Sequence, residues 1–200
     1  MPSGASERAR TLDGGLERLL ASITLPSLRD TVAQVRTYLL KQNADLGNTN
    51  NVYQILKTAA SHDLVYVSLG PSFDKGPTES HFYLESGSRL SFGITLRESG
   101  RSCSLVAYRF QLNLPEEQSP SFYRFDLNDR VHETPLFEPR CHYHPGSDEV
   151  RLPCPALTPL EVLDRIFLVI EPQLVVGSGS GRAASSSPMC AKAPPPPKPA

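Results

Sequence analysis

The sequence predicts an α+β fold, with N-terminal helices, a mostly antiparallel sheet and a C-terminal helix packed on that sheet. Apolar residues recur at helical spacing in 28–39, alternate with polar residues from residue 64 onward, and return to helical spacing near the C-terminus. Of the 200 residues, 39% are apolar, which is enough to bury one core. We therefore expect a single domain at 15–176, between a flexible lead at 1–14 and a disordered, Gly/Ser/Pro-rich tail at 177–200.

Helices are expected in the first part of the chain. Apolar residues in 16–23 have helical spacing, and Pro26 ends that short helix. Ser27 and Asp30 have the form of a capping box, with Asp in place of the usual Glu, and open a second helix. Its apolar face consists of Leu28, Val32, Val35 and Leu39. A third helix is expected after the turn-rich run 43–51, with apolar residues Val52, Ile55, Leu56 and Ala59.

The middle of the chain has the alternation of strands, and we expect a sheet of roughly five to seven of them. Leu64–Leu69 is β-branched and aromatic, and His81–Glu85 and Arg89–Leu96 are strand-like runs on either side of a Ser-Gly-Ser turn. Two similar segments follow, Tyr108–Leu112 (YRFQL) and Tyr123–Leu127 (YRFDL), each with aromatic and apolar residues on one face. These two are expected to pair as an antiparallel hairpin.

If the two similar segments pair, Arg109 and Arg124 lie on the same face of the sheet. Together they form a basic spot that can hold a phosphate or a carboxylate. The alternative is that both arginines pair with nearby acidic residues, such as Asp126 or Glu98, on a solvated face.

The last predicted element is a helix that begins at Thr158. Thr158, Pro159 and Glu161 match the N-cap, N1 and N3 positions of a capped helix, which should end near Pro172. Its buried face consists of Leu163, Ile166, Phe167 and Ile170. The proline-rich end of the tail should form a polyproline II segment, which can bind a protein partner.

The densest group of chemically active side chains lies in Pro139–Pro155, PRCHYHPGSDEVRLPCP. An extended strand at its start would place His142 and His144 on one side, about 7 Å apart at Cα, and Cys141 and Tyr143 on the other. Histidine titrates near neutrality, so one imidazole can act as base and the other as acid. Such a pair can catalyse a cleavage of RNA in which the 2′-OH of the RNA is the nucleophile, and this reaction needs no cofactor.

Three other interpretations of the histidine pair remain open. With a third ligand, namely His132, Asp148 or Glu149, the pair can hold zinc or iron. Beside Arg140 or Arg124, it can bind a phosphate or a partner's carboxylate without catalysis. The pair can also be two exposed side chains at the end of a strand, because HxH is a short pattern.

Composition limits the cellular setting and the function classes. The net charge of −1 and the pI near 6.5 argue against a strongly basic nucleic-acid-binding surface. The N-terminus lacks a signal peptide, and no apolar run reaches the length of a membrane span, so we expect a cytoplasmic protein. Four cysteines without a CxxC pair favour reduced thiols, although a Cys141–Cys154 bridge around a loop is sterically possible.

A family resemblance follows from the order of these segments. A YRF strand, an RFDL strand, a short HxH strand and a final helix together resemble the small prokaryotic toxins of the TumE type, from toxin–antitoxin pairs. The resemblance covers about residues 88–171, and the matching residues are Tyr123, Arg124, His142 and His144. It leaves the N-terminal helices and the proline-rich tail outside.

The resemblance implies a toxin-like protein that acts on RNA and has an antitoxin-like partner. His142 and His144 would then be the catalytic residues, and Arg124 would neutralise phosphate, with Arg109, Arg140 and Tyr123 as further substrate-binding residues. No cofactor would be needed, whereas zinc on His142, His144 and Asp148 is the alternative. A different class of function is a non-enzymatic adaptor that binds another protein through its sheet or its proline tail.

Overall fold

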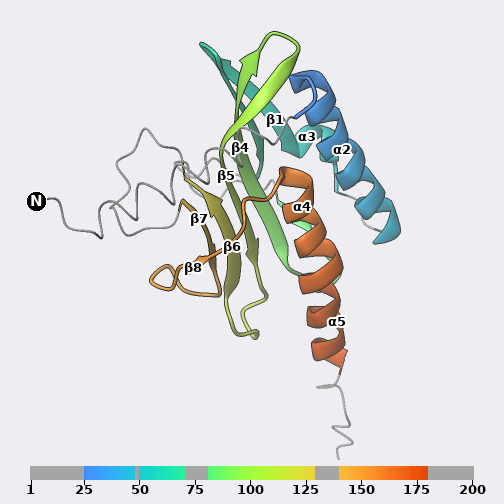
Figure 1. The fold of residues 1–200 in the computed structure, drawn as a ribbon. Helices are drawn as coiled ribbons and strands as arrows, with labels where there is room; N and C mark the ends of the chain where they lie inside the picture. Colours follow the sequence, from blue (N-terminus) through green and yellow to red (C-terminus); the bar gives the residue numbers. More distant parts are fainter. Residues whose placement is uncertain (1–24, 48–49, 71–80, 129–139, 180–200) are drawn as a thin grey trace, which may run out of the picture.

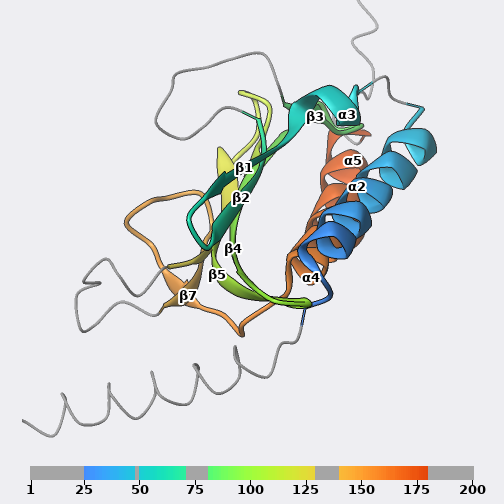
Figure 2. The same ribbon diagram turned by 90° about the horizontal axis from the view of Figure 1, so that it is seen from above.

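The computed structural model describes residues 25–47, 50–70, 81–128 and 140–179. One sheet of eight strands, with every neighbouring pair antiparallel, carries helices on one face (Figures 1 and 2). The α+β class, with an N-terminal helix and a C-terminal helix beside the sheet, is therefore confirmed. The helical elements are α2 (Leu28–Asp45), α3 (Val52–Ile55), α4 (Pro159–Asp164), the π-helix η1 (Arg165–Ile170) and α5 (Glu171–Gly179).

The strand order across the sheet is β1-β2-β4-β5-β6-β7-β8, and β3 pairs with β4. The sheet has more strands than the sequence predicted, because β1 and the two-residue β8 were not expected. The bounds are β1 Leu56–Ser61, β2 Leu64–Leu69, β3 Phe82–Tyr83, β4 Arg89–Ser99, β5 Ser102–Asn113, β6 Phe122–Leu127, β7 Cys141–His144 and β8 Leu152–Pro153. In Figure 2 the long strands β4 and β5 curve around the helices.

Helix α2 begins as predicted, because the Ser27 side chain accepts a hydrogen bond from the backbone N–H of Asp30. Val35 and Leu39 on its apolar face are buried. The predicted third helix is wrong beyond Ile55. Residues Leu56–Ser61 form β1 instead, paired with β2. The backbone hydrogen bonds between the two strands outweigh the weak helix preference of this run. The helix expected at 16–23 lies outside the described residues.

The two YRF segments pair as predicted. Phe110 lies opposite Phe125, and Leu112 lies opposite Tyr123, on the face that carries the helices. Apolar side chains of β4, β5 and β6 on this face form the core with α2, α4 and η1. The opposite face of β5, β6 and β7 therefore holds the polar residues of the same strands.

The C-terminal helix has the predicted start: Thr158 and Glu161 form a complete capping box. Its predicted end near Pro172 is wrong, because α5 continues to Gly179. In a regular α-helix, proline lacks the N–H of the helical hydrogen bond and its ring collides with the carbonyl group four residues earlier. The wider turns of η1, which lies directly before Glu171 and Pro172, relieve that collision.

The predicted domain boundary at 177 thus falls inside α5, while residues 180–200 and the lead at 1–14 lie outside the described part. Among the described helices, none combines the length and the apolar character needed to cross a membrane.

Candidate functional site

Strands β6 and β7 bring four polar residues together on the sheet face that points away from the helices. Arg124 lies opposite His144, and Asp126 lies opposite His142. Phe125, between the two β6 residues, points into the core, so alternation turns its neighbours to the other face. The prediction that the two histidines share a face is confirmed, and their ring centroids are 4.9 Å apart.

The histidine pair is buried rather than exposed. His142 retains 2% of its accessible surface, His144 0% and Asp126 2%. The interpretation of two exposed side chains at a strand end is therefore wrong. Buried polar groups of this kind require partners, because an unpaired buried charge is strongly destabilising.

The Asp126 carboxylate is at the centre of these contacts. Its Oδ1 accepts a hydrogen bond of 3.0 Å from Nε of Arg109, and its Oδ2 accepts one of 2.7 Å from Nε of Arg124. The same Oδ2 lies 3.3 Å from Nε2 of His144 and 3.6 Å from Nε2 of His142. The two arginines share a face as predicted, and both pair with Asp126, as the alternative interpretation stated.

The contacts of His144 fix where its neutral imidazole carries the proton. Nδ1 lies 3.0 Å from the carbonyl oxygen of Ser147, which can only accept, so Nδ1 is the protonated nitrogen. Nε2 lies 2.9 Å from Nη2 of Arg124, which can only donate. One edge of the guanidinium therefore binds both the Asp126 carboxylate and the lone pair of the imidazole.

The loop after β7, residues 145–151, contacts the site through Ser147 and Asp148. Asp148 accepts a hydrogen bond from Nη1 of Arg124, and this bond, with the positive charge of Arg124, lowers the pKa of Asp148. The Asp148 side chain is 72% exposed, whereas that of Arg124 is 13% exposed. Gly146 holds the loop in place: its φ is +92°, and a Cβ there would lie 2.1 Å from Cβ of Pro120.

A metal ion has a possible ligand set here, with Asp126 in place of the predicted Asp148. The ligand atoms of Asp126, His142 and His144 all lie within 4.8 Å of one another. Two imidazoles and a carboxylate suit zinc or iron(II). The guanidinium of Arg124 already binds two of these ligand atoms, so a metal ion could bind only after this cation moved away. His132, another predicted ligand, lies outside the described residues.

Two predicted substrate-binding residues are not part of this group. Arg140 donates from Nε to the carbonyl oxygen of Asn128 (2.8 Å) and from Nη2 to that of Val106 (3.0 Å), which ties the start of β7 to its neighbours. Tyr123 lies on the helix-bearing face, stacked on Tyr143 with ring centroids 6.1 Å apart. Arg140 thus anchors the start of β7, and Tyr123 packs on Tyr143 of the same strand.

Asp126 is a functional candidate that the sequence pattern does not identify as a site residue, since the pattern indicates it only as an ion-pair partner for the arginines. The signal was present, since Asp126 lies two residues after Arg124 and therefore on the same strand face.

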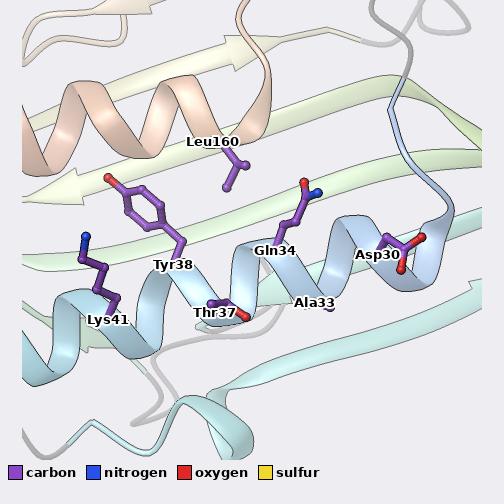
Figure 3. A pocket seen from close by; sticks show the side chains of 7 residues that line it. All are labelled: Asp30, Ala33, Gln34, Thr37, Tyr38, Lys41 and Leu160. Atoms are coloured by element: carbon purple, nitrogen blue, oxygen red, sulfur yellow. The ribbon is translucent and has the colours of Figure 1, made fainter.

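A shallow groove lies on the other side of the molecule, between α2 and α4 (Figure 3). Its lining consists of Asp30, Ala33, Gln34, Thr37, Tyr38, Lys41 and Leu160. In Figure 3 the charged groups of Asp30 and Lys41 lie at opposite ends, and the Tyr38 hydroxyl donates to Oδ1 of Asp164 (2.7 Å). The groove therefore lacks the close grouping of titratable side chains that the β6–β7 face has.

Comparisons of this chain with protein-family models, curated proteins and solved structures find no match.

Proposed function

We propose that this chain is a toxin-like protein that cleaves RNA, with His142 as general acid, His144 as general base and Arg124 as the phosphate-binding residue. The observation that carries the proposal is the convergence of these three side chains around Asp126 on β6 and β7. The residues that match the TumE-type resemblance on this face are the same three.

The proposed chemistry follows from the contacts. Nε2 of His144 has a free lone pair when Arg124 turns to a phosphate, so it can take the proton of a 2′-OH. The 2′-oxygen then attacks the adjacent phosphorus, and His142 protonates the departing 5′-oxygen. The guanidinium of Arg124 stabilises the charge that develops on the phosphate oxygens. Asp126, 3.3 Å from Nε2 of His144, stabilises the imidazolium that forms.

Both imidazoles are buried, so we propose that the loop 145–151, which contacts His144 and Arg124, moves to admit the substrate. Asp148 supports such a movement. Its exposed carboxylate binds Nη1 of Arg124 at the surface. An incoming phosphate can take the place of this carboxylate on the guanidinium, because exposed ion pairs are weak. In this proposal the loop covers the site in the free protein and opens when RNA binds.

Growth after induced expression tests the proposal in cells. Expression of the wild-type chain should arrest growth, and the double variant His142→Ala/His144→Ala should relieve the arrest. His62→Ala, at an exposed histidine in the β1–β2 turn, is the matched control and should still arrest growth. Equal growth with the wild-type and the double variant contradicts the proposal. An adjacent small antitoxin-like reading frame in the genome would support it.

A test with purified protein separates RNA cleavage from other causes of arrest. An RNA oligonucleotide should be cut to a cyclic phosphate and a 5′-hydroxyl, while the same sequence with 2′-deoxyribose at the cleaved position should stay intact. Circular dichroism of each variant shows whether it is folded. Cleavage of both substrates at equal rates would exclude the 2′-oxygen as nucleophile.

A second candidate function, metal binding, rests on the ligand atoms of Asp126, His142 and His144. Elemental analysis of the purified protein tests it. Stoichiometric zinc or iron that is lost in His142→Ala/His144→Ala would favour this function, and a metal-free wild-type protein would end it.

A further inference from the structure

Cys141 and Cys154 lie directly opposite each other at the edge of the sheet. The β7–β8 register pairs His142 with Pro153, and the next pair in the same register is Cys141 with Cys154. The backbone N–H of Cys154 donates to the carbonyl oxygen of Cys141 (3.2 Å), which continues the ladder by one pair.

The geometry of this pair is suited to a disulfide. Directly opposite residues of a hydrogen-bonded antiparallel pair are about 5.5 Å apart at Cα, within the range of about 4.4–6.8 Å that disulfides have. The two Sγ atoms are 3.3 Å apart as thiols. Rotation of the side chains is therefore enough to close the bond, and the backbone does not need to move.

The two sulfur atoms have different surroundings. Sγ of Cys141 lies 3.6 Å from the hydroxyl oxygen of Tyr108 and 3.1 Å from the carbonyl oxygen of Pro155, whereas Cys154 is partly exposed. The thiolate is the nucleophilic form of a cysteine. Cys141 is only 3% exposed, so only a small oxidant can reach it.

We propose that Cys141 and Cys154 are a reversible dithiol–disulfide pair that hydroperoxides oxidise. The thiolate of Cys141 attacks one oxygen of hydrogen peroxide, the O–O bond breaks, and a sulfenic acid and hydroxide form. The hydroxide takes the proton of the Cys154 thiol and becomes water. The Cys154 thiolate then attacks the sulfur of the sulfenic acid and displaces its oxygen, which leaves as a second water after protonation by solvent. Two thiols and one peroxide thus give one disulfide and two waters.

The disulfide would close a loop that contains residues 145–151. Ser147 and Asp148 in this loop contact the site through His144 and Arg124. Oxidation would restrict the motion of that loop, because its two ends would be joined covalently. The disulfide proposal does not depend on RNA cleavage, since it rests only on the two thiols and their contacts.

Peptide mapping of the full-length reduced protein tests the pair. After treatment with an equimolar amount of hydrogen peroxide, the remaining thiols are alkylated under denaturing conditions and the digest is analysed by mass spectrometry. We expect a peptide pair that links Cys141 to Cys154, at a mass about 2 Da below the two free thiol peptides and reversible by dithiothreitol. Cys103, which is also buried, is the internal reference and should be fully alkylated.

Two variants separate the roles of the cysteines. In Cys154→Ser, a sulfenic-acid probe such as dimedone should label Cys141, because the second thiol is missing. In the matched control Cys103→Ser, the Cys141–Cys154 link should form at the same rate as in the wild type. Full alkylation of both Cys141 and Cys154 in the peroxide-treated wild type overturns the proposal, as does equal linkage of Cys141 to Cys103 or Cys190.

Discussion

Nη2 of Arg124 lies 2.9 Å from Nε2 of the buried His144, and a guanidinium N–H can only donate, so the imidazole nitrogen is placed as the acceptor. The same guanidinium binds Asp126 through Nε. Arg124 thus places a positive charge beside the buried carboxylate of Asp126.

The first prediction concerns the protonated nitrogen of His144. In the neutral ring, Nδ1 should carry the hydrogen, because it faces the carbonyl oxygen of Ser147. Nitrogen chemical shifts of His144 in ¹⁵N-labelled protein at neutral pH measure this directly. In Arg124→Ala the Nε2 atom loses its donor, so the preference for one tautomer should weaken. A hydrogen on Nε2 in the wild-type protein would contradict the described geometry.

The second prediction concerns the free energy of unfolding. Asp126→Ala should lower it by about 3–5 kcal/mol, since Arg124 would lose its buried carboxylate partner and keep only His144 and the exposed Asp148. Asp148→Ala is the control, because this carboxylate is 72% exposed and its pair with Arg124 should contribute about 0–1 kcal/mol. Urea denaturation of the three proteins gives the comparison. Equal losses in the two variants would show that burial of Asp126 is not the cause.

The third prediction uses two glycines that both have positive φ. Gly146→Ala should destabilise the protein more than Gly100→Ala. A Cβ at Gly146 would meet Pro120 at 2.1 Å, whereas nothing lies within 4 Å of a Cβ at Gly100. The left-handed backbone alone costs about 1–2 kcal/mol at either position, so the difference between the variants measures the contact with Pro120. Similar unfolding midpoints for the two variants would mean that the loop moves away from Pro120 to fit the added Cβ without any loss of stability.

The fourth prediction is a dependence of stability on alkaline pH. Burial, and then the neighbouring Tyr123, raise the pKa of Tyr143 to about 12 from its ordinary 10.0. The folded state therefore favours the neutral phenol. Its contribution is fully present below pH 10 and is lost as the pH rises toward 12. Unfolding free energies across this window should fall less steeply in Tyr143→Phe than in the wild-type protein, and identical slopes would contradict the assignment.

Period-two alternation predicted most of the sheet and the shared face of the two histidines. It worked for Tyr108–Leu112 and Tyr123–Leu127, because each has one apolar and one polar face, which fixes both the strand type and its register. It could not identify β1, whose run of small and polar residues has only Leu56 buried and becomes a strand by pairing with β2.

The burial of the histidines could not be predicted from β7 alone. Their polar partners come from outside β7, because Asp126 lies on the neighbouring strand and Ser147 lies in the loop after His144. Likewise, the continuation of the last helix past Pro172 depends on a π-helix, which has no distinct sequence pattern.

The two faces of β7 differ in chemistry, one apolar and one polar, and this difference selects the alignment of the strand during folding. β7 is only four residues long, so few backbone hydrogen bonds select its alignment with β6. A shift by one residue would turn His142 and His144 toward the apolar side chains beneath the helices and would bring Cys141 against Asp126. A misaligned β7 would therefore bury two imidazoles among apolar side chains and remove His144 from Arg124 and Asp126, so the polar contacts of the histidines select the native alignment of the sheet edge.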